Sequence, residues 1–146
     1  MRNLGKSFLV LLGFVLAAGA AFGLDPESEA LRAADRQFRA GNYLLALESY
    51  QSFLQRYPLS DRAAEAMLRV GISQYSLSRF AAAAETFRTV ELRYGPAAAL
   101  ETLPYWVGLT HYSLGDFAEA QSALNRFLAT PPPAPLRGRA RLVGAL

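Results

Sequence analysis

The chain contains no cysteine and only one histidine, His111. The absence of cysteine excludes a disulfide framework, a thiol nucleophile, a zinc–thiolate centre and a cysteine-linked lipid anchor. One histidine does not complete a metal site, and a lone histidine is more often a core or half-buried residue than a catalytic base. We therefore expect no metal ion and no cofactor.

A large excess of basic charge is also missing. The formal net charge is +3, but Arg2 and Lys6 lie in the N-terminal leader and all 12 acidic residues follow it, so the remaining chain carries +1. Nucleic-acid binders usually show a strong, clustered basic footprint, and we expect no nucleic-acid partner. A small cluster at Arg137, Arg139 and Arg141 could touch anionic lipid or glycan, but a solvated helix face explains it more simply.

Residues 1–23 have the pattern of a secretory signal peptide. Arg2 and Lys6 precede an apolar core over residues 8–17, and small residues then offer cleavage after Ala20 or after Gly23. The alternative is an uncleaved membrane anchor, although the apolar stretch is just shorter than the ~20 residues of a spanning helix. We expect a protein exported to the periplasm, not a lipoprotein, with no integral membrane span after cleavage.

An internal repeat organises the rest of the chain. The segment 41–58 has two similar copies, 78–95 and 115–132, and the alanines in register are 37 residues apart. The register positions are Tyr43, Phe80 and Phe117; Ala46, Ala83 and Ala120; Tyr50, Phe87 and Leu124; Phe53, Val90 and Phe127. Their gaps of three and four residues predict one amphipathic helix in each copy.

A second helix precedes each of these, so the sequence predicts three helical hairpins. The expected helices span about residues 26–40, 43–57, 62–77, 80–94, 96–114 and 116–130. Pro104 either kinks the fifth helix or marks its true start. No segment alternates with the period of two that a strand shows, which predicts an all-α fold.

Small and polar residues punctuate these helices. Asp25 and Asn42 suit helix N-caps, and Gly41 suits a left-handed turn residue. The first helices of the hairpins also carry small residues 37 positions apart, at Ala34, Gly71 and Gly108. These positions should allow the two helices of a hairpin to pack closely.

The repeat resembles the tetratricopeptide repeat over Glu27 to Pro132. The matching motifs are Val70-Gly71 and Val107-Gly108 in the first helices, Gly41-Asn42-Tyr43 with Ala46 and Gly115-Asp116-Phe117 with Ala120 at the turns, and the terminal Pro58 and Pro132. The departures are Ser78 for a turn glycine, Gly95 for a terminal proline, Ala33-Ala34 in the first repeat, and the longer period. The ending Phe53-Leu54-Gln55-Arg56-Tyr57-Pro58 looks like the cell-envelope branch of the family, which includes outer-membrane assembly proteins and the Tol–Pal-associated cell-division coordinator.

The resemblance implies a right-handed α-solenoid over residues 24–132, with repeats at about 27–59, 64–95 and 101–132. Residues 133–146 would form a proline linker and the start of a fourth repeat, because Val143-Gly144 repeats the earlier pairs. Solenoids normally close with a polar capping helix, and this end is apolar. We expect a truncated chain, a reading that also predicts self-association; a dimer partner covering the end is the alternative.

The resemblance also implies a concave groove that binds peptides, lined by the second apolar stripe of the first helices. The expected groove residues are Leu31, Phe38, Leu68, Ile72, Tyr75, Tyr105, Leu109 and Tyr112. Phe38, Tyr75 and Tyr112 would form an aromatic ladder for a protein or peptide partner. The alternative is that these side chains pack between adjacent first helices and are buried.

No catalytic motif competes with this hypothesis. The carboxylate pairs Glu27/Glu29 and Asp116/Glu119 lie at expected helix starts, where negative charge is favourable. We therefore predict a non-catalytic interaction scaffold or adaptor of the bacterial cell envelope. The alternatives are an N-terminal accessory domain of a larger envelope enzyme, such as a peptidoglycan-processing hydrolase, and a self-assembling structural solenoid.

Overall fold

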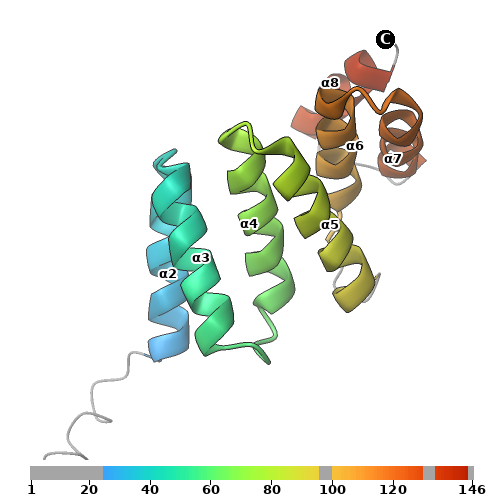
Figure 1. Cartoon of the computed structure of the whole chain (residues 1–146). Coiled ribbons are helices and arrows are strands. Elements are labelled where there is room, and N and C mark those ends of the chain that lie inside the picture. Colours follow the sequence, from blue (N-terminus) through green and yellow to red (C-terminus); the bar gives the residue numbers. More distant parts are fainter. Residues whose placement is uncertain (1–24, 96–99, 130–133, 145–146) are drawn as a thin grey trace, which may run out of the picture.

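The computed structural model describes residues 25–95, 100–129 and 134–144, and the expected leader lies outside them (Figure 1). Within these ranges the chain forms helices and no strand, so the all-α prediction is confirmed. The helices are α2 (Pro26–Arg39), α3 (Tyr43–Arg56), α4 (Ala63–Ser76), α5 (Phe80–Tyr94), α6 (Leu103–Leu114), α7 (Phe117–Ala129) and α8 (Ala134–Gly144).

The helices pair into three antiparallel hairpins, α2–α3, α4–α5 and α6–α7, that stack side by side (Figure 1). We call α2, α4 and α6 the A helices, and α3, α5 and α7 the B helices. Each B helix packs on the A helix of its own hairpin and on the A helix that follows. The A helices touch one another much less. The solenoid is therefore tightly packed between A and B helices and more loosely packed between neighbouring A helices.

The turn inside each hairpin uses a left-handed residue. Gly41 has φ 77° and Gly115 has φ 85°, as glycine at these positions predicts. Ser78 takes the same place in the second hairpin with φ 59°, although a side chain in this region costs about 1 kcal/mol. The turn geometry is therefore retained in the repeat that departs from the glycine pattern.

The helix starts confirm one predicted cap and correct another. The Asp25 side chain accepts hydrogen bonds from the backbone N–H groups of Glu27 and Ser28, both at 3.2 Å. Asn42 precedes α3, but its side chain makes no capping hydrogen bond. Its Nδ2 instead donates to Gln37 Oε1 at 2.9 Å, because the tight turn brings the end of α2 within reach.

Pro104 marks the start of α6 rather than a kink. The helix begins at Leu103, so Pro104 lies in its first turn, where a missing backbone N–H leaves no helical bond unmade. The expectation that this helix begins near residue 96 is therefore wrong. The Gly95–Pro96 break falls partly outside the described residues, which resume at Leu100.

Glycine lets the helices of a hairpin approach closely, as predicted. A Cβ atom on Gly71 would lie 2.7 Å from Phe87 Cδ1, and one on Gly108 would lie 2.6 Å from Leu124 Cγ. Both distances are shorter than van der Waals contact allows. Phe87 and Leu124 are each 1% exposed, so they fill the space that the absent side chains leave.

The last helix, α8, packs against α6 and α7. Ala140 is fully buried there, and Leu136 and Val143 are half-buried against the same apolar cluster. The prolines expected to form the linker before it, residues 131–133, lie outside the described residues. The helix thus continues the row of A helices by one member.

Candidate partner-binding cleft

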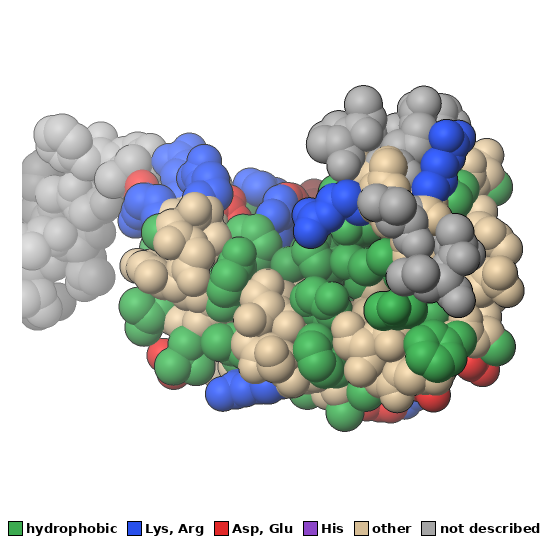
Figure 2. All heavy atoms as spheres, turned by 90° about the horizontal axis from the view of Figure 1, so that it is seen from above, with side chains coloured by type: hydrophobic (Ala, Val, Ile, Leu, Met, Phe, Trp, Pro, Cys, Tyr) green, Lys and Arg blue, Asp and Glu red, His purple; other side chains and the backbone are tan. Residues whose placement is uncertain are grey.

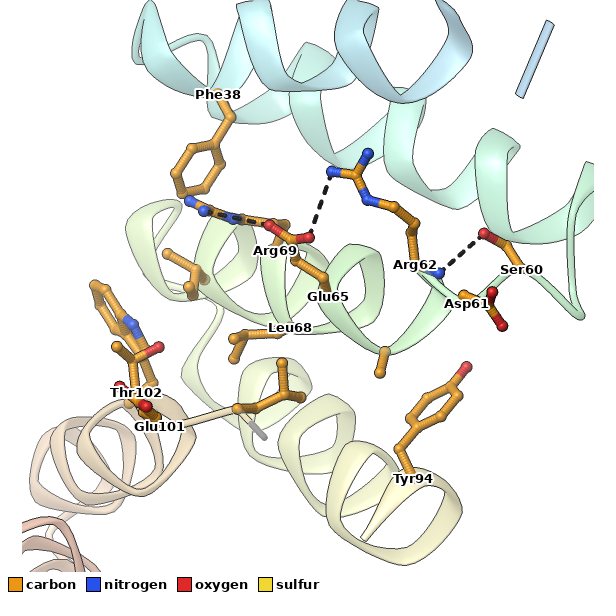
Figure 3. A pocket seen from close by; sticks show the side chains of 14 residues that line it. Phe38, Ser60, Asp61, Arg62, Glu65, Leu68, Arg69, Tyr94, Glu101 and Thr102 are labelled. Atoms are coloured by element: carbon orange, nitrogen blue, oxygen red, sulfur yellow. Dashed lines mark hydrogen bonds and ion pairs between the residues drawn. The ribbon is translucent and has the colours of Figure 1, made fainter. Parts of the chain in front are cut away.

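A cleft of about 790 Å³ opens between α2, α4, the end of α5 and the start of α6. We call it the central cleft; Figure 3 shows the side chains around it. Its lining consists of Phe38, Ser60, Asp61, Arg62, Ala64, Glu65, Leu68, Arg69, Ile72, Tyr94, Leu100, Glu101, Thr102 and Trp106. Cavities of this volume are typical of sites that hold small ligands or short segments.

The base of the central cleft is apolar. Leu68 and Ile72 lie one turn apart on α4, and Trp106 of α6 and Phe38 of α2 flank them. Leu68 and Ile72 are each 5% exposed, so they belong both to the core and to the wall of the cleft. An apolar side chain of a partner that enters the cleft here would bury its surface against these apolar residues, which is favourable.

One wall of the central cleft is charged. Glu65 of α4 lies between Arg62, which precedes the helix, and Arg69 on it: Oε2 is 3.5 Å from Arg62 Nη2 and Oε1 is 3.8 Å from Arg69 Nη2 (Figure 3). The Arg69 guanidinium also lies 4.7 Å from the centre of the Phe38 ring, a cation–π contact that holds both side chains in place. Two guanidinium groups share the Glu65 carboxylate, and Asp61 and Glu101 add two further carboxylates to the lining of the cleft.

These polar residues were not among the groove residues predicted from the sequence. Arg62, Glu65 and Arg69 follow one another at intervals of three and four residues, so they share a helix face with each other. Arg69 and Trp106 occupy the same repeat position, 37 residues apart. This shared repeat position was the available signal, and both residues line the cleft.

The predicted groove residues divide between two cavities. Phe38, Leu68 and Ile72 line the central cleft. Tyr75, Tyr105 and Leu109 line a second, smaller cavity of about 220 Å³ between α4, α6 and α8. Leu31 and Tyr112 line neither of the two.

The predicted groove residues differ in how much of each side chain is exposed to a partner. Leu31 and Tyr105 are 3% and 1% exposed, because neighbouring helices cover them. Phe38, Tyr75, Leu109 and Tyr112 remain half-buried. Leu68 and Ile72, each 5% exposed, are nearly as buried as these two residues, so burial alone does not separate packing residues from groove residues.

The three residues of the expected aromatic ladder form pairs with other rings at the hairpin turns. Each member contacts the aromatic residue that begins the next B helix, with ring centroids 5.6 Å apart for Phe38–Tyr43, 5.2 Å for Tyr75–Phe80 and 5.6 Å for Tyr112–Phe117. The middle member also packs edge-on against Trp106 at 5.6 Å. These rings stabilise the turns as well as facing the next repeat.

The turns of the hairpins gather at one end of the molecule, where hydrophobic side chains spread across the middle of the surface and basic side chains follow one edge (Figure 2). Several apolar side chains near the turns are exposed, among them Leu44, Leu45, Leu114 and Phe117. Nothing in the described structure covers this surface.

His111 and Glu27, a member of one carboxylate pair, contact side chains of neighbouring segments. The His111 Nδ1 atom lies 3.3 Å from Asp116 Oδ2 across the α6–α7 turn. Glu27 lies in the first turn of α2, where its Oε1 accepts a hydrogen bond from Ser60 Oγ.

Among the described residues, no group of three histidine or acidic side chains comes together as metal ligands would. In the same ranges no helix has the length and apolarity needed to cross a bilayer.

The architecture and the repeat together define a helical-repeat interaction protein. Two models of the tetratricopeptide repeat match this sequence, one over residues 31–99 and the other over residues 101–131. The chain therefore belongs to the tetratricopeptide-repeat family, as its motifs predicted. No curated protein matches it.

Solved structures share the fold. One is PcrH in complex with the chaperone-binding region of PopD, with a TM-score of 0.66 and 21% identity over 84% of this chain and 92% of that chain. Another is PcrH from Pseudomonas aeruginosa, with a TM-score of 0.65 and 21% identity over 84% of this chain and 93% of that chain. At this identity the similarity concerns the fold.

Proposed function

We propose that this protein is a non-catalytic scaffold that holds a short segment of a protein partner in the central cleft. The observation that carries the proposal is the cleft itself, which places an apolar base of Leu68, Ile72 and Trp106 beside the charged wall of Arg62 and Arg69. Such a combination binds an apolar side chain and orients the polar groups next to it.

The relative with a bound segment supports this proposal. PcrH shares the fold and has been solved with the chaperone-binding region of PopD. By analogy, this chain would receive a segment of a partner protein. The resemblance of fold does not by itself give a function, so the chemistry of the cleft carries more weight.

Filling the cleft tests the proposal directly. Ala64 lines the central cleft from α4, and Ala64→Phe should occupy the space that the partner segment needs. Ala82 is exposed on α5 and does not line the cleft, so Ala82→Phe is the matched control. In a pull-down from the source cell extract, the parent chain and Ala82→Phe should retain the same specific partner.

Ala64→Phe should lose that partner while its circular dichroism spectrum remains helical, although its melting temperature should fall because Ala64 is only 8% exposed. Capture that survives in a folded Ala64→Phe variant would contradict the assignment of the cleft.

We propose further that the protein acts in the cell envelope of a bacterium, in the periplasm. The support is the leader in residues 1–23, with its basic start, apolar core and small residues before the expected cleavage site. Expression of the full chain followed by osmotic shock should release a shortened form, and mass spectrometry should place the new N-terminus after Ala20 or after Gly23. An intact chain in the cytoplasmic fraction would contradict this proposal.

A further inference from the structure

Another cleft, of about 450 Å³, lies between the B helices α5 and α7, which both pack on α6. We call it the outer cleft. No residue lines both the outer cleft and the central cleft. The outer cleft is therefore a separate place at which a partner can be bound.

The preceding repeat has a larger side chain at one position of the outer cleft. Ala84 lines the cleft from α5, and Leu47, 37 residues earlier, holds the same repeat position on α3 and is 5% exposed. The first two hairpins stack with this leucine buried at their junction. Stacking of hairpins therefore does not require the small residue that leaves the outer cleft open.

Charged side chains surround the outer cleft, and most of them stand where the preceding repeat has uncharged residues. Arg88, Glu91, Glu119 and Arg126 line the cleft, and the residues 37 positions earlier are Gln51, Leu54, Ala82 and Thr89. These charges are thus specific to the junction of the second and third hairpins and do not belong to the repeat pattern.

The charges of this lining do not balance, because it contains three carboxylates and two guanidinium groups. Arg88 Nη2 lies 2.9 Å from Glu85 Oε2, and Arg126 Nη2 lies 3.6 Å from Glu91 Oε1. Glu119 is exposed in the first turn of α7 and forms no ion pair within the described part of the chain. Its carboxylate is therefore available to a cation that enters the cleft.

Apolar residues form the rest of the outer cleft. Phe87 and Val107 are 1% and 8% exposed, and Ala84 and Ala118 add small apolar side chains to the lining. Lysine and arginine combine a long apolar stem with a charged end. A side chain of this kind matches a cleft that has apolar walls and one unpaired carboxylate.

We propose that the outer cleft binds a basic side chain, arginine or lysine, of a protein partner, with the stem against Ala84 and Ala118 and the charge at Glu119. An anionic group fits less well, because both guanidinium groups of the lining already contact carboxylates. The inference goes beyond the proposed function, because it gives the scaffold a second site that does not depend on the central cleft.

Peptide selection with a closed-cleft variant tests this inference. A displayed library of random heptapeptides would be selected on the full chain, and peptides that also bind Ala84→Leu would be removed. Ala84→Leu introduces the residue of the first repeat and should close the cleft while the circular dichroism spectrum remains helical. Ala81 is exposed on α5 and does not line the cleft, so Ala81→Leu is the matched control and should bind the selected peptides like the parent chain.

The selected peptides should share an arginine or lysine at one position. Citrulline in place of that arginine, or norleucine in place of that lysine, should weaken binding to the parent chain about fivefold. The same replacement should change nothing in Glu119→Gln, because the charge it removes no longer has its partner. Glu48 is exposed on α3 and outside the cleft, so Glu48→Gln should show the full fivefold loss.

The other outcomes contradict the inference in different ways. Peptides without a basic residue, an undiminished loss in Glu119→Gln, or a library with no peptide that Ala84→Leu rejects would overturn it. A parent chain that self-associates in sedimentation velocity, and that Glu119→Gln makes monomeric, would assign the cleft to a second copy of the chain instead.

The Ala64→Phe variant separates this inference from the proposed function. Selected peptides should bind Ala64→Phe as tightly as the parent chain, and peptides that it fails to bind would place them in the central cleft and overturn the inference. A partner that Ala64→Phe still captures in the pull-down would contradict the assignment of the central cleft and leave the outer cleft unaffected.

Discussion

The two apolar sides of helix α4 differ in their packing: one is covered by its own B helix, and the other lines the central cleft. On the side facing its own B helix, α4 presents Gly71, and the buried Phe87 ring fills the space above it. On the side facing the next A helix, α4 presents Leu68 and Ile72, which line an open cleft. Both sides look equally apolar in the sequence, so apolar character alone does not tell a closed contact from a binding surface.

The largest effect should come from disturbing the closed side. Gly71→Val would place side-chain atoms where the Phe87 ring lies, and overpacking of this kind should lower the free energy of unfolding by about 3 kcal/mol. Chemical denaturation measured by circular dichroism would show the loss.

Gly138 provides the matched control for that change. It lies inside α8 with no other atom near its missing Cβ, so Gly138→Ala should stabilise the protein by about 0.5–1 kcal/mol through helix propensity. If the two glycines responded alike, close packing would not explain Gly71.

The aromatic pairs at the turns should give the next largest effects, and they should differ along the solenoid. Tyr75 packs against Phe80 and Trp106, whereas Tyr112 packs against Phe117, which is 64% exposed. Tyr75→Ala should therefore cost about 2 kcal/mol and Tyr112→Ala about 1 kcal/mol. Equal losses in denaturant titrations would show that the neighbouring repeat adds nothing to the turn pairs.

A buried tyrosine inside the first hairpin should make stability depend on alkaline pH. Burial, and then the hydrogen bond from Tyr50 Oη to Asp35 Oδ1 at 2.6 Å, raises the pKa of Tyr50 above its usual value of 10. The unfolded chain ionises first, so the free energy of unfolding should fall by about 1.4 kcal/mol per pH unit above about pH 10 for each such group.

Tyr50→Phe should cost about 1.5 kcal/mol at neutral pH, because the hydrogen bond to a carboxylate is lost. It should also make the decline above pH 10 less steep. Burial raises the pKa of Tyr105 as well, so part of the decline should remain. Urea titration across this pH range would measure the decline in the free energy of unfolding. If Tyr50→Phe left the steepness of that decline unchanged, Tyr50 would not be the group responsible.

The smallest effect should lie on the outer surface. Arg126 Nη2 of α7 and Glu91 Oε1 of α5 are 3.6 Å apart, and both side chains are partly exposed to solvent. A double-mutant cycle with Glu91→Gln and Arg126→Gln should give a coupling of about 0.5 kcal/mol that disappears in 1 M salt. A coupling that salt does not weaken would mean that these helices are joined by more than an exposed ion pair.

Local chemistry allowed much of the fold to be predicted. Gly41 and Gly115 adopt the left-handed turns that their lack of a side chain favours, and Asp25 caps α2. Asn42 was predicted as a cap and is not one, because Gln37 from the preceding helix reaches its side chain. This error arose because the turn brings the last residues of the preceding helix within reach of the Asn42 side chain.

The candidate site was less predictable. The groove stripe included Leu68, Ile72 and Phe38, which line the central cleft, but it also included Leu31 and Tyr105, which do not line it. The polar residues Arg62, Arg69 and Tyr94 were missed, since each is unremarkable within its own helix.

The sequence by itself determined the repeat, the helical hairpins and the close contact at each small residue, because period and side-chain size act over one or two turns of helix. The tertiary structure alone decided which part of the second apolar stripe stays open. That outcome depends on the distance between neighbouring A helices, which the stacking of the B helices between them sets. It also decided that the Tyr94 hydroxyl, carried by a B helix, would be buried beside the cleft with no hydrogen-bond partner in the part of the chain that the structure describes.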